Sequence, residues 1–310
     1  MGDLLSLVLT LRPLEQPESS APLHIWWGRA AHSLLLDVAR QYNPGLSDAL
    51  HEPPSAADAS QAASSNAIRP FSVSTLVGRF SHVALDPHSL YSLRFTTLNS
   101  ELASILLQAA SGGPLAPGAR VELDYRPFQI ESAIRASPST STEAASIPPG
   151  AQPALADWAG QTTYQELSAS LLLSKEPAPR RVTLYFASPT TFKSGGLHMP
   201  VPLPELVFGS LLERWNAFAS LAFPPEGRRY ASECLAIGRY QLSSRMVTLK
   251  SGGQRVGAVG EVTYTSVNYD RYWMSLVGVL AAFALYSGVG ASTSMGLGQC
   301  REISEGRKYL

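Results

Sequence analysis

Two kinds of residue in this sequence could do chemistry: a few histidines, and a dense run of glycines near the end of the chain. Histidine can give or take a proton near neutral pH, because its ordinary pKa is about 6.5. The six histidines are scattered, with no spacing typical of a metal site. His32 and His51 fall within or beside predicted helices and are the candidates for acid–base chemistry. Taken alone, His51 would more often be an ordinary exposed histidine at a helix end.

The glycine run consists of a Gly-Val-Gly triplet at 288–290, five residues, and a Gly-Leu-Gly triplet at 296–298. Glycines at this density allow positive φ and let the backbone approach a ligand, with N–H groups that suit phosphate oxygens. A dinucleotide-binding fingerprint follows a strand and opens a helix, whereas this run follows a helix and precedes a strand. A phosphate-binding loop and a tight turn that only joins two elements are therefore the two interpretations.

The elements that position these residues follow a regular order in the first half of the chain. From the spacing of apolar residues, strands are predicted at 3–12, 71–77, 89–97 and within 120–134, and helices at 24–42, 46–50 and 100–110. Residues 52–67, rich in Pro, Ala and Ser, are predicted to be a surface loop. The order strand, helix, strand, strand, helix, strand is the ferredoxin-like pattern.

The second half repeats this order. Strands are predicted at 182–186, 234–249, 260–266 and 299–303, and helices at 204–218 and 272–286. The stretch 136–160 is rich in Ser, Thr, Pro and Ala and is predicted to be a linker. We therefore expect an α+β protein with tandem ferredoxin-like (RRM-like) domains, at 1–135 and 161–310, the second carrying the glycine-rich loop.

Charge gives no general support for nucleic-acid binding, because Lys plus Arg and Asp plus Glu both number 24. Any basic footprint must be local. Arg239 stands beside a tyrosine and Arg245 follows on the same predicted strand, while Lys193 opens a glycine-containing loop. Such residues can contact phosphate and bases, although solvated strand ends are the commoner role of any one of them.

Cysteine usage and the start of the chain bear on location. Two cysteines, Cys234 and Cys300, are too few for a disulfide framework or a four-thiolate zinc site, which favours a reducing, intracellular setting. The start carries Asp3 where a signal peptide has positive charge, so no export signal is predicted. We expect a cytoplasmic protein. A rival is a membrane span at 272–291, since 272–300 lacks charge, but its glycine and hydroxyl residues make a poor lipid-facing helix.

Several segments together resemble one protein family. Asn43–Glu52 is similar to an N-P-x-L-x-x-x-L-H-E segment that follows the first helix in the Cas family-six endoribonucleases, which process CRISPR repeats. The paired glycine triplets before the last strand resemble the glycine-rich loop of that family. Further similar segments are 69–74, 188–192, 204–208 and 260–264. The matches span most of the chain in family order, so their joint occurrence is more specific than any one of them.

The resemblance implies a reaction and its partners. The 2′-hydroxyl upstream of the cut attacks the adjacent phosphate, which leaves a 2′,3′-cyclic phosphate and a 5′-hydroxyl. The nucleophile belongs to the RNA, so the protein supplies proton transfer and positive charge, and no metal or other cofactor is expected. The expected partner is CRISPR repeat RNA or precursor CRISPR RNA, with Cas proteins of an interference complex as a second class. Monomer and homodimer both stay open.

The resemblance also implies catalytic residues. His51 matches the family's catalytic histidine and is predicted to act as general acid or base. His32 could reach the same cleft from the preceding helix, or could simply be a satisfied residue at the edge of its apolar face. Arg69 aligns with a lysine of some members and could neutralise the phosphate or be a solvated strand-end charge. A tyrosine that some members carry falls here on Leu36, so a second catalytic group is not assigned.

In that family the glycine-rich loop lies against the repeat RNA. The implied RNA-binding residues are Gly288, Gly290, Ser292, Thr293, Ser294, Gly296, Gly298, Lys193, Arg239 and Arg245. The competing interpretation is a non-catalytic subunit that only holds the repeat or guide RNA within an interference complex.

Overall fold

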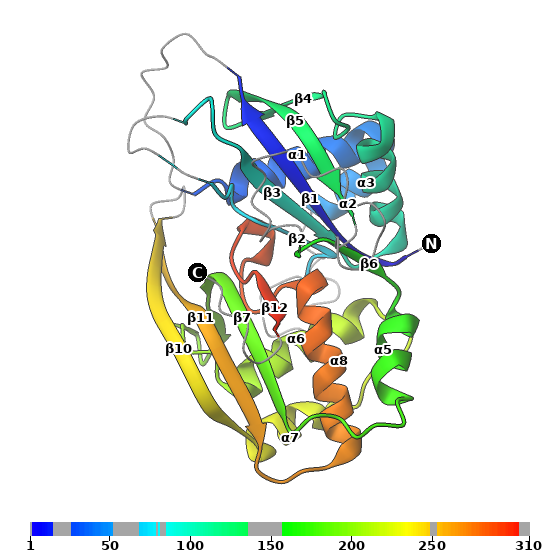
Figure 1. Ribbon diagram of the computed structural model, residues 1–310, viewed down its shortest axis with the longest axis vertical. Coiled ribbons are helices and arrows are strands. Elements are labelled where there is room, and N and C mark those ends of the chain that lie inside the picture. The colour runs from blue at the N-terminus through cyan, green and yellow to red at the C-terminus, as the bar shows by residue number, and fades with distance from the viewer. Residues whose placement is uncertain are drawn as a thin grey trace. The chain divides into compact units, whose positions relative to one another are not determined.

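The computed structural model describes residues 2–14, 26–51, 68–78, 80, 85–135, 157–248 and 253–303. The chain forms two compact units, Met1–Gln161 and Thr162–Leu310, which appear in Figure 1 as the blue-to-green part and the green-to-red part. Each unit is built around its own antiparallel sheet.

The first unit has the ferredoxin-like arrangement. Its strands are β1 (Leu4–Pro13), β2 (Phe71–Val73), β3 (Tyr91–Thr97), β4 (Arg120–Leu123) and β5 (Arg126–Ile134), and its helices are α1 (Gly28–Tyr42), α2 (Pro44–His51) and α3 (Ser100–Gly112). The sheet order is β2-β3-β1-β5-β4. Without the added hairpin strand β4 and the short strand β6 (Gly160–Thr162), which pairs with β1, the four remaining strands follow the order second, third, first, fourth of the ferredoxin-like fold.

Alternation along β1 builds the core of the first unit. Leu5, Leu7, Leu9 and Leu11 all point to one face, where α1 and α3 cover them. Helix α1 contributes Ala31, Leu34, Leu35 and Val38 at helical spacing to the same core. This packing fixes α1, and with it the elements that follow, against the sheet.

The second unit repeats the arrangement. Its strands are β7 (Arg181–Thr190), β10 (Leu235–Thr248), β11 (Gln254–Ser266) and β12 (Cys300–Glu302), and its helices are α5 (Tyr164–Leu172), α6 (Pro204–Phe218), α7 (Glu226–Cys234) and α8 (Arg271–Ser287). The order β10-β11-β7-β12 is again second, third, first, fourth. A short hairpin of β8 (Phe192–Ser194) and β9 (Leu197–Met199) follows β7. Tandem ferredoxin-like domains are thus confirmed.

An aromatic cluster joins the helices of the second unit. Trp215 of α6 is fully buried, stacks on Phe223 at 4.5 Å between ring centroids, and contacts Tyr164 and Phe283 edge-on. Such aromatic pairs add to the stabilisation that burial alone provides. Helix α8 is therefore a core helix of this unit and ends at Ser287. No helix among the described residues, α8 at 271–287 included, is long and apolar enough to cross a membrane.

Several predicted boundaries were wrong for local reasons. Helix α2 begins at Pro44, two residues earlier than predicted, because Pro fits the first helical position and Asn43 caps the helix. The strand predicted at 71–77 ends at Val73, and Val77 makes only an isolated bridge to β3. Helix α7 was not predicted, because its sequence is largely polar and buries only Gly227, Tyr230 and Ala231.

The predicted linker at 136–160 and the domain bounds stay a prediction, because 136–156 and the surface loop 52–67 lie outside the described residues. The four residues that end the predicted linker are described. Trp158 is buried, accepts a hydrogen bond at its carbonyl from the Ser6 hydroxyl, and carries the Arg94 guanidinium 4.7 Å above its ring. A short strand, β6 (Gly160–Thr162), follows at the unit boundary.

Candidate functional site

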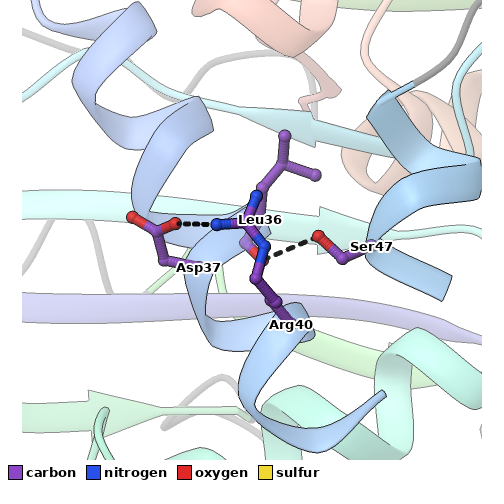
Figure 2. A network of polar contacts seen from close by, with 4 residues as sticks. All are labelled: Leu36, Asp37, Arg40 and Ser47. Atoms are coloured by element: carbon purple, nitrogen blue, oxygen red, sulfur yellow. Dashed lines mark hydrogen bonds and ion pairs between the residues drawn. The ribbon is translucent and has the colours of Figure 1, made fainter. Parts of the chain in front are cut away.

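One candidate site, in the first unit, is the end of α2, which α1 and the turn before it hold in place. The Asn43 side chain accepts a hydrogen bond from Leu46 N–H at 3.1 Å and so caps the helix. In Figure 2 the buried Ser47 hydroxyl of α2 donates to the Leu36 carbonyl of α1 at 3.2 Å. These bonds join α2 to α1, so the last residue of α2, His51, has a fixed backbone position.

Arg69 links that helix end to α1. Its Nη1 donates to the Leu50 carbonyl oxygen at 2.7 Å and lies 3.4 Å from His32 Nε2. Leu50 is the residue directly before His51 in the same helix. The structure therefore brings His32, Arg69 and the backbone of His51 together, although 37 residues separate His32 from Arg69 in sequence.

The His32 imidazole is buried, with 7% of the residue exposed, and its ring centroid lies 5.3 Å from that of Phe71. Arginine has no acceptor, so a hydrogen bond between Arg69 and His32 requires that Nε2 accept. The imidazole is then neutral, with its proton on Nδ1. Protonation at Nε2 would place two positive groups 3.4 Å apart, which is unfavourable in a partly buried site.

The Arg69 guanidinium is half-buried and lies 5.9 Å from the centroid of the Phe71 ring. Burial lowers the pKa of Arg69 below its ordinary value, but a guanidinium stays charged near neutral pH. A fixed cation beside His51 could stabilise negative charge on a phosphate. The side chain of His51 lies outside the described part of the structure, as does Glu52.

A separate candidate site, in the second unit, is the glycine-rich loop between α8 and β12. Gly288, Gly290, Gly296 and Gly298 all have positive φ, between 61° and 93°, which strongly favours glycine. A Cβ on Gly298 would collide with the Val289 carbonyl, which shows how closely the two ends of the loop approach. Glycine is needed here because the loop packs against itself.

Backbone hydrogen bonds close this loop onto its own unit. Val289 N–H donates to the Gly298 carbonyl at 2.8 Å, Gly298 N–H to the Pro189 carbonyl at 3.1 Å, and Ala291 N–H to the Thr191 carbonyl at 2.8 Å. Those N–H groups are therefore not available to phosphate oxygens. Of the predicted RNA-binding residues, Gly288, Thr293, Gly296 and Gly298 are buried, whereas Gly290, Ser292 and Ser294 are partly accessible.

The basic candidates of the second unit lie at different places on its sheet. Lys193 is exposed on β8, two residues after Thr191, which contacts the loop. Arg245 is exposed on the edge strand β10, opposite Gly257 of β11, whose Cβ position faces the Thr190 backbone. Arg239 is exposed six residues further along β10, which corresponds to about 20 Å in a strand. Lys193 and Arg245 thus lie at the loop end of the sheet, and Arg239 does not.

His198 of β9 lies within the electrostatic influence of Arg255 and Lys193. Burial, and then the positive charges of Arg255 and Lys193, lower the pKa of His198 below its ordinary value. The hairpin is therefore a locally positive part of the second unit, although the chain as a whole is neutral. Among the residues that the structure describes, no group of three or more His, Cys, Asp or Glu side chains is arranged to hold a metal ion.

A sequence profile described as "CRISPR-associated endoribonuclease Cas6" matches residues 184–300. Two curated Cas6 proteins of Mycobacterium tuberculosis, from strains CDC 1551 and H37Rv, are 30% identical over 127 residues, which is 40% of this chain and 40% of theirs. One from Streptococcus thermophilus is 30% identical over 140 residues, 43% of this chain and 56% of that one. Residues 184–300 of this chain thus match the Cas6 family. The aligned stretches span only about half the length of these curated relatives.

Solved structures of Cas6 proteins agree with this family over nearly the whole chain. A product complex of a Thermus thermophilus Cas6 has a TM-score of 0.71 at 24% identity and covers 98% of this chain and 100% of that one. A Cas6 solved with one histidine changed to alanine has a TM-score of 0.67 at 25% identity, with 98% and 100% covered. The resemblance to the Cas6 family that was predicted from the sequence is thus confirmed.

Sequence reasoning missed two residues of α6 that hold the glycine-rich loop in place, Ser210 and Arg214. The Ser210 hydroxyl accepts from Gly290 N–H at 3.0 Å, and Arg214 Nη2 donates to the Gly290 carbonyl at 2.7 Å. A signal was present, because Arg214 stands among Leu211, Leu212 and Trp215 on the apolar face of the predicted helix. A charged residue on such a face usually has a specific partner.

Proposed function

We propose that this chain is a metal-independent endoribonuclease that binds CRISPR repeat RNA and cleaves precursor CRISPR RNA within the repeat. The main support is the contact of Arg69 with both His32 and the Leu50 carbonyl, beside the backbone of His51. This arrangement offers a proton-transfer group and a fixed cation at one helix end. The matched Cas6 structures include product and substrate-mimic complexes of those proteins.

The proposed reaction is an internal transesterification in the RNA. The 2′-oxygen upstream of the cut forms a bond to the adjacent phosphorus as it loses its proton, and the bond to the 5′-oxygen breaks as that oxygen gains one. His51 moves a proton in this step. Arg69 stabilises the extra negative charge on the phosphate, and it needs no reorganisation because it is already fixed.

In this scheme His32 is a positioning residue. Its neutral ring orients the guanidinium of Arg69, and its burial keeps that geometry rigid. Placing the cation correctly accounts for part of the rate, since small displacements of a charged group weaken its interaction with the transition state.

RNA binding is assigned to the accessible part of the glycine-rich loop and to the basic residues of the second unit. Gly290, Ser292 and Ser294 present backbone and hydroxyl groups, while Lys193 and Arg245 add charge at the same end of the sheet. Arg239 would contact the RNA at a point further from the loop. Buried Gly288, Thr293, Gly296 and Gly298 support the loop and are not expected to touch RNA.

The decisive experiment incubates the purified chain with RNA of the CRISPR repeat from its own organism in excess EDTA. We expect cleavage at one site, with a 2′,3′-cyclic phosphate and a 5′-hydroxyl at the new ends. RNA in which the single upstream 2′-hydroxyl is replaced by hydrogen should bind but stay intact. Cutting of that RNA would mean a water or protein nucleophile. Tight binding without any cutting would instead indicate a subunit that only holds the repeat.

A further inference from the structure

Side chains of helix α6 form hydrogen bonds with both polar groups of the Gly290 backbone, the N–H and the carbonyl oxygen. Ser210 accepts from its N–H at 3.0 Å, and Arg214 donates to its carbonyl oxygen at 2.7 Å. The two side chains are four residues apart and so lie one above the other on the same face of α6. On the other side of Gly290, a Cβ would collide with the Thr191 carbonyl. The start of the loop is thereby clamped between α6 and the end of β7.

Arg214 is buried, with 7% of the residue exposed, and no carboxylate among the described residues forms an ion pair with it. Its Nε atom is buried without a hydrogen-bond partner in the described part of the chain. The one acid that favours its charged form, Glu213, is exposed and already paired with Arg228 at 2.9 Å. Burial lowers the pKa of Arg214 to about 10, so it is still a cation at neutral pH. A buried charge of this kind destabilises the fold unless something offsets it.

The C-terminal end of α8 indicates a role for the charge of Arg214. Helix α8 ends at Ser287, directly before the loop, and its last turn contains no basic residue. The free carbonyls at a helix C-terminus carry a partial negative charge, which repels phosphate. Arg214 lies on the adjacent Gly290 carbonyl and offsets that repulsion from inside the unit.

We infer that Arg214 is a positioning residue for RNA binding, which fixes the Gly290 carbonyl and supplies the positive charge under the accessible Ser292–Ser294 turn where a phosphodiester docks. This inference rests on the proposed RNA-binding function of the loop. Arg214 does not itself touch the RNA, because it is buried beneath the loop. The phosphodiester completes the charge pairing that the protein alone leaves open.

The test compares Arg214→Met with Arg229→Met in the full chain. Arg229 is an exposed arginine of α7, and α7 packs on Trp273 near the opposite end of α8, about 20 Å from the loop. For Arg214→Met we expect a melting temperature at or above that of the wild type, because a well-packed apolar residue replaces an unpaired buried charge. We expect its dissociation constant for repeat RNA to rise about tenfold. Arg229→Met should change the dissociation constant less than twofold.

The outcomes separate this inference from the function on which it rests. If the wild type does not bind repeat RNA, the proposed function fails. If the wild type binds and Arg214→Met binds equally well, only the proposed role of Arg214 is overturned. That role is also overturned if the melting temperature of Arg214→Met falls while its affinity per folded molecule equals that of the wild type.

If Arg214→Met does not fold, the variant Arg214→Lys tests the inference instead. A buried lysine loses its proton at much lower pH than arginine. The affinity of Arg214→Lys relative to wild type should therefore fall as pH rises from about 6.5 to 9. A ratio that is constant over this range would overturn the inference.

Discussion

The end of α2 in the first unit and the glycine-rich loop in the second unit are built on opposite plans. At the end of α2, side chains from distant parts of the sequence converge, and their functional groups are the site. In the loop, four of the eleven residues at 288–298 are glycine, and the backbone is folded against itself and against β7 and α6. A proton-transfer site needs particular atoms at particular distances, whereas a surface for a polymer backbone needs a fixed shape and a positive field.

This difference indicates which property a mutation in each region should change. Changing a side chain at the end of α2 should affect the rate of cutting and leave folding and RNA affinity largely intact. Changing a glycine of the loop should affect folding and affinity before it affects chemistry.

After His51, the largest effect of this kind is expected for Arg69→Met. Loss of the fixed cation should lower the single-turnover cleavage rate about 10²- to 10³-fold, with RNA affinity changed less than threefold. The matched control is Arg40→Met on α1, since Arg40 is exposed and pairs with Asp37 at 3.4 Å (Figure 2). An exposed pair of this kind contributes little, so the control should cut normally. Equal cleavage by both variants would remove Arg69 from the site.

Gly290→Ala tests the loop. Its φ of 77° and the collision of a Cβ with the Thr191 carbonyl should together destabilise the second unit by about 2–4 kcal/mol. Gly195→Ala is the matched control, because Gly195 also has positive φ, 57°, but nothing lies near its Cβ position. It should lose only about 1 kcal/mol. Denaturant unfolding measures both, and equal losses would mean that the loop is not tightly packed at Gly290.

A smaller effect, on the cleavage rate, distinguishes a positioning role of His32 from a proton-transfer role. His32→Gln keeps an acceptor for Arg69 and should cut within about threefold of the wild-type rate, while His32→Leu loses the acceptor and should cut about tenfold more slowly. If His32 transferred the proton itself, both variants would lose at least about 100-fold. Single-turnover rates at saturating protein separate these results.

The smallest expected effect concerns the positive field of the hairpin. Arg255 lowers the pKa of His198, because a nearby cation disfavours the imidazolium. Arg255→Gln should therefore raise that pKa, as followed by NMR titration of the His198 ring, while Arg229→Gln should not. Because the folded-state pKa of His198 is depressed, protonation as pH falls costs stability, and Arg255→Gln should lessen that loss. An unchanged titration would place Arg255 away from His198.

Much of the fold follows from local patterns. Pro204–Phe218 was predicted with the bounds it has, because a proline begins the helix and its apolar residues recur at helical spacing. The sheet order of both units follows from the order of elements once the ferredoxin-like pattern is recognised. Helix α7 escaped prediction, since its polar sequence becomes helical only through packing against α6 and α8.

The candidate site could be predicted only in part. The segment around His51 and the glycine spacing can be recognised from the sequence alone. The contact of Arg69 with the Leu50 carbonyl and the backbone pairing of Val289 with Gly298 need the tertiary fold, because their partners are set by packing and not by spacing. For the same reason the sequence suggested seven loop residues for RNA, whereas burial leaves three of them accessible.

The most direct test of the central claim is the single-turnover cleavage rate of repeat RNA by His51→Ala in EDTA, measured beside the wild type and beside a binding titration. The account predicts that the wild type cuts without metal, and that His51→Ala binds the RNA within about threefold of wild-type affinity but cuts at least about 10³-fold more slowly. Cleavage by His51→Ala at the wild-type rate would contradict it.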